Sequence, residues 1–158
     1  MRTSEIMLDR NFNAKLPVLV ITQSSPTTDN GPGTRSYIDP AYVDTGRIFP
    51  QAAYIYSLGV MLLEIVCGEK PILLADMKNH LVEKVQKCQE KTAILDAADT
   101  SLRGQFDEEI KRALEIGLMC VRSDRDKRPQ IRELRNCLKQ LVTGRAGPEI
   151  FETEIWGP

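Results

Sequence analysis

The longest apolar stretch of the chain constrains its fold more than any other feature. Residues 52–68 read AAYIYSLGVMLLEIVCG, and within this stretch Glu64 is the single charged residue. A helix that is apolar on all sides normally lies at the centre of a domain. Gly68 at the end of the stretch and Pro71 just beyond it are typical of a helix C-terminus. The sequence therefore predicts one buried central helix that ends at Gly68, with other helices packed around it.

The length of the apolar run and the balance of charged residues indicate the compartment of the chain and the partners that it lacks. Residues 52–67 form a shorter run than the roughly 18–20 apolar residues that a bilayer span needs. The N-terminus lacks the basic-then-apolar pattern of a secretory signal. Lys and Arg number 21 against 22 Asp and Glu, so charge gives no reason to expect nucleic acid or an anionic membrane as a partner. We expect a soluble chain in the cytoplasm, with no membrane insertion and no nucleic-acid binding.

The cysteines and the single histidine give no metal site. The cysteines show no Cys-x-x-Cys spacing, and each lies in an apolar helical context, so we expect reduced thiols in the core and no disulfide framework. His80 falls on a helix that we expect to be exposed, and it has no second histidine or nearby cysteine with which to bind a metal. The four cysteines are Cys67, Cys88, Cys120 and Cys137.

Shorter patterns predict the remaining elements in chain order. Two apolar runs joined by a turn-like Asp9-Arg10-Asn11 predict a β-hairpin within residues 5–22, and residues 23–36 are rich in Ser, Thr, Gly and Pro, as loops are. Apolar residues three or four positions apart predict outer helices further on. The predicted elements are strands at 6–8 and 16–21, a helical turn at 40–43, and helices at 76–91 and 107–122. A last helix is predicted from Pro129, at its first helical position, to residue 141. Its buried residues are predicted to be Ile131, Leu134, Leu138 and Leu141.

Four segments in this order resemble the C-terminal lobe of a protein kinase, and most closely the plant receptor-like Ser/Thr kinases of the legume-lectin type. They are TSEIMLDRNFNAKL at residues 3–16, GTRSYIDPAY at 33–42, YSLGVMLLEIVCGEKPI at 56–72 and DRDKRPQIREL at 124–134. The resemblance implies a mainly α fold with a small hairpin, an activation-segment loop, a central helix and outer helices. It covers residues 1–144 as a partial kinase domain and leaves residues 145–158 as a C-terminal tail.

The same resemblance indicates that the catalytic positions have changed. It sets Val18 where the family has the metal-binding Asp, Glu5 where it has the catalytic-loop Asn, and Arg2 where it has the phosphate-contacting Lys. A valine side chain has no oxygen for Mg²⁺, and phosphoryl transfer depends on that metal. The His-Arg-Asp triplet would lie directly before Met1, and the 158 residues hold no Gly-rich phosphate loop. We therefore expect no catalytic residue, no metal site and no binding of the ATP and Mg²⁺ that the family uses.

Residues that shape the activation segment differ from the family as well. The Glu that pairs with an Arg of the last-helix segment is Ala41 here, while the Arg persists as Arg128. Since an unpaired buried Arg costs roughly 3–5 kcal/mol, we expect Arg128 to find Asp126, Asp124 or water. Ser36 takes the place of a Gly, and Tyr54 that of the Asp that begins the central helix.

Two features suggest interactions. Hydroxyls of the loop, above all Ser25, Thr28 and Thr34, are candidate phosphorylation sites, with the plain alternative that they are solvated loop residues. A lobe that normally packs under another domain also leaves apolar surface, for which residues 18–21 of the hairpin are the sequence candidate.

Three functional hypotheses remain open at this stage. The first is a catalytically inactive kinase-like domain that acts at most as a binding or decoy module for intact receptor-like kinases. The second is a protein serine/threonine kinase with ATP binding whose N-terminal part is missing from the gene model. The third is a gene remnant without function.

Overall fold

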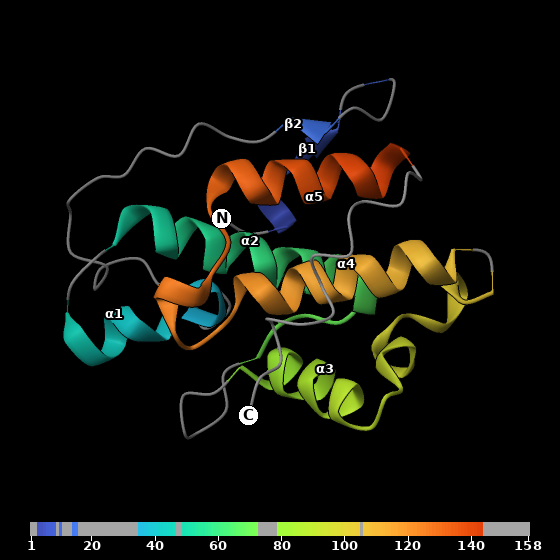
Figure 1. Cartoon of the computed structure of the whole chain (residues 1–158), viewed down its shortest axis with the longest axis horizontal. Coiled ribbons are helices and arrows are strands. Elements are labelled where there is room, and N and C mark those ends of the chain that lie inside the picture. Colours follow the sequence, from blue (N-terminus) through green and yellow to red (C-terminus); the bar gives the residue numbers. More distant parts are fainter. Residues whose placement is uncertain are drawn as a thin grey trace.

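A computed structural model describes residues 3–8, 10, 14–15, 35–46, 49–72, 79–104 and 106–143 of the chain, in part for the backbone alone. The described residues form a mainly helical fold, shown in Figure 1. Its elements are η1 (Thr3–Glu5), β1 (Met7–Leu8), β2 (Ala14–Lys15), η2 (Arg35–Tyr37), α1 (Pro40–Thr45), α2 (Pro50–Cys67), α3 (His80–Glu90), η3 (Ile94–Ala97), η4 (Thr100–Leu102), α4 (Asp107–Cys120), η5 (Arg125–Lys127) and α5 (Ile131–Thr143).

Helix α2 is the predicted central helix, and its largest helical interface is with α4. The two backbones approach closely at a pair of glycines. A Cβ added at Gly59 would lie 2.5 Å from the Cβ of Cys120 and 2.9 Å from the carbonyl oxygen of Gly117. A Cβ added at Gly117 would lie 2.5 Å from the Cδ2 of Leu63. The α2–α4 contact therefore leaves no room for a side chain at Gly59, and a side chain at Gly117 would require Leu63 to move.

The C-terminus of α2 agrees with the sequence prediction, and its start does not. Gly68 follows the helix in the left-handed conformation, with φ of 66°, and its N–H donates to the carbonyl oxygen of Glu64. The helix begins at Pro50, two positions before the predicted Ala52, since proline is well suited to the first helical turn.

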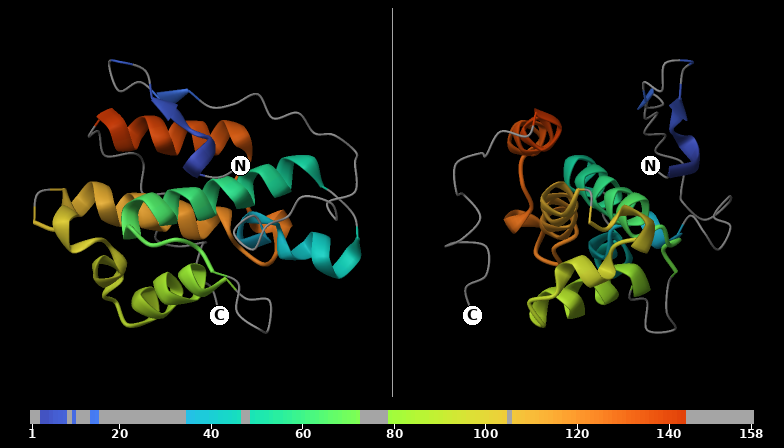
Figure 2. Two further views of the ribbon diagram at one scale, coloured as in Figure 1. Left: turned by 180° about the vertical axis from the view of Figure 1, so that it is seen from behind. Right: turned by 90° about the vertical axis from the view of Figure 1, so that its right-hand side faces the viewer.

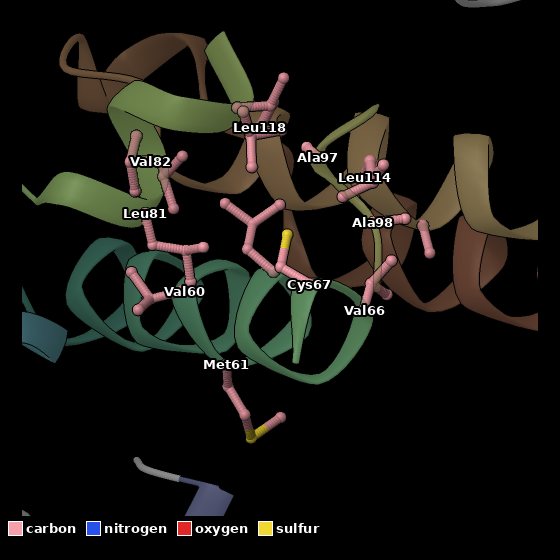
Figure 3. Close-up of a cluster of buried hydrophobic side chains, with 14 of the residues drawn as sticks. Val60, Met61, Val66, Cys67, Leu81, Val82, Ala97, Ala98, Leu114 and Leu118 are labelled. Carbon is pink, nitrogen blue, oxygen red and sulfur yellow. The ribbon is translucent and has the colours of Figure 1, made fainter. Parts of the chain in front are cut away.

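The main hydrophobic core lies between α2, α3, α4 and η3. Leu63, Leu81, Val85 and Leu114 are completely buried in it. Figure 3 shows Val60 and Cys67 of α2 on the same side as Leu81 and Val82 of α3 and Leu114 and Leu118 of α4. In Figures 1 and 2, α3 lies on one side of the α2–α4 pair and α5 on the other.

Helix α3 is shorter than predicted because Asn79 caps it. The side chain of Asn79 accepts a hydrogen bond from the N–H of Leu81, so the helix starts at His80, where the imidazole is exposed as expected. The remainder of the predicted helix, including Met77, lies outside the described residues.

The start predicted for the last helix was wrong. Pro129 precedes α5, which begins at Ile131. The cause is Glu133, whose carboxylate accepts the N–H of Gln130 at 2.8 Å and so makes Gln130 the residue before the first turn. Ile131, predicted to be buried, is 51% exposed, whereas Leu134 is buried and both Leu138 and Leu141 are half-buried.

The predicted hairpin is present with a different second strand. Met7 pairs with Lys15 and Leu8 with Ala14 in an antiparallel ladder. The second strand was predicted at residues 16–21, where the apolar run lies. The connection from Leu8 to Ala14 is shorter than a connection from Leu8 to the apolar run would be. The shorter connection favours Ala14–Lys15 as the second strand. Residues 16–21 lie outside the described residues.

Two further expectations can be compared with the described structure. All four cysteines are free thiols, and Cys67 and Cys120 are buried. Helix α2 is, within the described ranges, long and apolar enough to cross a membrane by length and composition, and it is half buried within the fold. A buried core helix passes the same test, so this observation is weak evidence for a span.

Candidate functional site

The buried ion pair between Arg128 and Asp39 organises the part of the molecule that the sequence singled out. The Nη1 atom of Arg128 lies 2.5 Å from Oδ2 of Asp39, and Nη2 donates to Oδ1 at 2.9 Å. The side chains are only 1% and 3% exposed. Arg128 also donates from Nε to the carbonyl oxygen of Arg122 and from Nη1 to that of Ala52. The guanidinium thus joins the segment before α1, the first turn of α2 and the loop before α5.

The prediction that Arg128 would find Asp126, Asp124 or water was therefore wrong. Asp124 caps η5 by accepting the N–H of Asp126, and Asp126 lies on the exposed surface near Arg125. Asp39 is better placed, since it is buried beside the guanidinium and also accepts the N–H of Ala41 as the N-cap of α1. A carboxylate two positions before Ala41 takes over the pairing that the family resemblance assigned to a Glu at position 41.

Tyr56 adds an aromatic face to this ion pair. The guanidinium carbon of Arg128 lies 5.1 Å from the centroid of the Tyr56 ring. The pKa of the Tyr56 hydroxyl is raised to about 12, mainly by burial and to a smaller extent by the Asp39 carboxylate, whereas the Arg128 charge lowers it. The phenol is therefore neutral at physiological pH and serves as a packing group.

The buried thiols are equally inert. Burial is the main cause that raises the pKa of Cys120 to about 12 and that of Cys67 to about 11. Since the thiolate is the reactive form, neither cysteine is suited to nucleophilic catalysis near neutral pH.

The segment around Ser36 is fixed to α2 and α3 by polar contacts. Its carbonyl oxygen accepts a hydrogen bond of 2.7 Å from the side-chain amide of Asn79, and the hydroxyl of Tyr37 donates to a carboxylate oxygen of Glu64. The Ser36 hydroxyl is buried and, among the described side chains, has no partner. A serine at a position where the resemblance implies glycine thus places an unsatisfied polar atom in the interior, which normally costs stability.

An open pocket lies next to the ion pair, between the first turn of α2 and the segment that leads into α5. Its volume is about 380 Å³. On one wall the guanidinium of Arg125 stacks 3.7 Å from the centroid of the Phe49 ring. The lining is mixed, with Phe49, Pro50, Gln51, Ala52 and Ile55 on the α2 side and Arg125, Asp126, Arg128, Pro129 and Gln130 on the other.

Most positions that the resemblance assigned to catalysis fall outside the described residues. Arg2 and Val18 do so, and Glu5 lies in η1 with only its backbone described. The loop hydroxyls of Ser25, Thr28 and Thr34 lie outside as well. Arg128 is thus the predicted site residue whose contacts the structure establishes.

The residues at these positions do not fit the Mg²⁺ that the family uses. Val18 offers a hydrocarbon where a carboxylate oxygen would be needed. In the part of the chain that the structure describes, no group of three His, Cys, Asp or Glu side chains is arranged to hold a metal ion.

Comparisons with known proteins connect this geometry to a family. No family model matches the chain. Similar proteins of Arabidopsis thaliana include the Probable L-type lectin-domain containing receptor kinase S.7, 32% identical over 96% of this chain and 24% of that protein. Another is the L-type lectin-domain containing receptor kinase IX.1, 37% identical over 84% of this chain and 22% of that protein. The chain therefore spans about a quarter of the length of these relatives.

A solved structure gives the same answer for the fold. The pseudokinase domain of BIR2, described as an immune regulator of the RLK/Pelle family, matches with a TM-score of 0.70 and 26% identity over 90% of this chain and 43% of that chain. The chain is a kinase-like domain related to plant receptor kinases. The mainly α fold of a kinase C-terminal lobe and the relationship to the L-type lectin group, both predicted from the sequence, are confirmed.

Sequence reasoning missed two residues of this kinase-like domain that fix its geometry. Asp39 precedes Pro40, and an Asp directly before a proline is a common helix start, so the signal for a cap was present. Its second role as the partner of Arg128 carried no local signal. Asn79 has a similar double role, as cap of α3 and donor to Ser36.

Proposed function

We propose that this kinase-like domain transfers no phosphate and acts by binding the cytoplasmic domains of intact receptor kinases. The main support for the absence of phosphate transfer is the valine at position 18. Kinase catalysis depends on metal ions that neutralise the phosphate charge, and a valine at the metal-ligand position supplies no oxygen for them. Glu5, at the position of the second ligand, would leave one carboxylate alone to hold the metal.

Retention of the fold supports the binding half of the proposal. The α2–α4 core is closely packed, and the buried Arg128 has a complete set of partners although position 41 is Ala. A domain that keeps its packing while its catalytic positions change is suited to recognising other proteins. The similarity to a pseudokinase that is described as an immune regulator agrees with such a role.

A phosphoryl-transfer assay tests the first half. The purified chain is incubated with γ-labelled ATP, Mg²⁺ and a general protein substrate, with the kinase domain of the IX.1 receptor kinase as the positive control. We expect no label above a mock purification, either in the substrate or in the chain itself. Label that persists through a second purification step and is absent from the mock sample would refute the proposal of inactivity.

A binding assay tests the second half. The immobilised chain is exposed to the purified cytoplasmic domain of the IX.1 or S.7 receptor kinase, and an unrelated kinase domain of similar size is the control. We expect selective retention of the receptor kinases. If binding occurs, mass spectrometry of the chain after incubation with ATP shows whether Ser25, Thr28 or Thr34 is phosphorylated, as a decoy substrate requires.

The names of the relatives favour a second candidate, a protein serine/threonine kinase that works when joined to an upstream part. The genomic sequence before the Met1 codon separates the two candidates. An open frame that ends in His-Arg-Asp and encodes a Lys-bearing strand would favour the enzyme. Val18 argues against it, because added upstream residues restore no oxygen at position 18.

The third hypothesis, a gene remnant, predicts a chain that does not fold. Cooperative urea unfolding of the purified protein would exclude it, and a non-cooperative transition would support it.

A further inference from the structure

Helix α5 carries positive charge along its outer face. Four of its exposed residues are Arg132, Arg135, Asn136 and Lys139. Steps of three, four and seven positions from Arg132 reach the other three, and residues at these steps share one face of a helix. We name this set the α5 basic stripe. It contains three positive charges, one amide and no acid.

Packing on the opposite side of α5 fixes the stripe toward solvent. Leu134 is buried in the small cluster that α2 and α4 form, and the half-buried Cys137 and Leu138 pack against the same cluster. The right-hand view of Figure 2 shows α5 at the edge of the group of helices. Rotation of α5 would expose Leu134, so the stripe stays on the surface.

The two arginines of the stripe have no partner within the described part of the chain. Neither Arg132 nor Arg135 donates a hydrogen bond to a described residue or forms an ion pair with one. Glu133 is next to Arg132 in the sequence, but its carboxylate accepts the N–H of Gln130 before the first turn of the helix. Two guanidiniums three positions apart are therefore available to an external anion.

We propose that the α5 basic stripe binds a phosphorylated serine or threonine of a receptor-kinase cytoplasmic domain. This inference rests on the proposed binding function and specifies its surface. Cβ atoms three positions apart on a helix are separated by about 5–6 Å, so the guanidiniums of Arg132 and Arg135 can reach one phosphate group. Each guanidinium presents paired N–H donors that match phosphate oxygens, and hydrogen bonds between charged groups are the strong ones. Lys139 adds a third positive charge on the same face.

The distribution of charge favours one phosphoryl group over an extended anionic surface. A phosphoryl group concentrates about 1.5–2 negative charges at one point, more than a carboxylate does. The rest of the surface is not basic, because the net charge of the chain is −1 and Asp124 and Asp126 are exposed shortly before α5. A nucleic-acid duplex or an anionic membrane would bring further negative charge against such acids, whereas one phosphorylated side chain contacts the stripe alone.

The experiment compares two forms of one partner. The purified cytoplasmic domain of the IX.1 receptor kinase is prepared with phosphorylated serines and threonines and, after treatment with a protein phosphatase, without them. Mass spectrometry verifies both states, and biolayer interferometry measures the binding of each to the immobilised chain. We expect the phosphorylated form to bind more than about tenfold more tightly, because it gains charge-assisted hydrogen bonds.

Three double variants assign this preference to the stripe. Arg132→Gln with Arg135→Gln removes both guanidiniums and should abolish the preference for the phosphorylated form. Arg132→Lys with Arg135→Lys keeps the charge but loses the paired donors, so it should retain only part of the preference. Lys91→Gln with Lys111→Gln removes the same charge from exposed positions outside α5 and should leave the preference unchanged. Circular dichroism verifies that all three variants fold like the parent chain.

The outcomes separate the inference from the proposed function. Equal affinity of the parent chain for both forms of the domain would overturn the inference and leave the proposed function standing. A preference that survives Arg132→Gln with Arg135→Gln, or that is lost in Lys91→Gln with Lys111→Gln, would do the same. Failure of the parent chain to bind either form would overturn the proposed function.

Other anions are measured in the same way. Vesicles that contain a phosphatidylinositol phosphate and a DNA duplex are the two probes, and we expect both to bind more weakly than the phosphorylated domain. Tighter binding of either probe, lost in Arg132→Gln with Arg135→Gln, would assign the stripe to a lipid surface or to nucleic acid and overturn the inference.

Discussion

The inner and outer sides of α2 differ in how closely they are packed, although both are largely apolar. On the inner side the fit is so close that an added Cβ at Gly59 or Gly117 would meet the facing helix, and Arg128 holds the first turn by donating to the carbonyl oxygen of Ala52. On the outer side, Ile65 is half exposed. The inner side should therefore contribute far more to the stability of the fold than Ile65 does. Substitutions on the two sides should separate these contributions.

The largest loss of stability should come from Arg128→Met. The substitution leaves the carboxylate of Asp39 buried without its partner, which typically costs about 3–5 kcal/mol. Urea unfolding followed by circular dichroism measures the free energy. Arg125→Met, in the same loop but at a more exposed guanidinium, is the matched control and should cost less than about 1 kcal/mol. Equal losses in the two variants would show that the ion pair does not anchor α2.

Gly59→Ala should follow, with a loss of about 1–3 kcal/mol or more from overpacking. The added methyl group meets the backbone oxygen of Gly117 as well as Cys120, and a helix backbone moves little. Gly117→Ala should cost less, because its new methyl group meets the flexible end of Leu63. The same unfolding measurement ranks the two variants, and a reversed order would contradict the close contact described for the inner side.

Alkaline pH should weaken the inner side gradually. Burial raises the pKa of Cys120 from 9.0 to about 12, so the neutral thiol is favoured in the folded state. Its contribution is complete below pH 9.0 and is lost as pH rises toward 12, at up to about 1.4 kcal/mol per pH unit for one group. Unfolding free energies measured across this range should fall less steeply in Cys120→Ala. An unchanged slope would assign the loss to other groups, such as Tyr56.

The smallest change in stability should come from the outer side. Ile65→Glu should alter the unfolding free energy by less than about 0.5 kcal/mol, as most surface substitutions do. Ile72→Glu, at a residue that is 60% exposed, is the matched control, and thermal unfolding of both variants side by side is sufficient. A loss above about 2 kcal/mol in Ile65→Glu would mean that Ile65 is part of the core, and the comparison between the two sides would fail.

The sequence was a good guide wherever the signal was local. The end of α2 at Gly68 followed from one glycine, and the position of α4 followed from its periodicity. Element starts were less accurate, because side chains such as Glu133 and Asn79 select the first turn by hydrogen bonds that periodicity does not reveal.

The site was harder to predict, since its main contact joins distant parts of the chain. The resemblance identified Arg128 as important and Ala41 as a lost partner, yet it gave no reason to choose Asp39. That choice depends on the tertiary fold, which brings Asp39, the first turn of α2 and the segment before α5 to one guanidinium. The exposure of Ile65 was also hidden, because a uniformly apolar sequence does not indicate which side of the helix the fold leaves exposed.

The Asp39–Arg128 pair has a consequence for how the chain is made. Its members are 89 positions apart in the sequence. During synthesis, α1 and the preceding turn leave the ribosome long before the guanidinium that holds them. Until residue 128 emerges, the early segment lacks this contact, and synthesis of the segment that carries Arg128 is the step that supplies it.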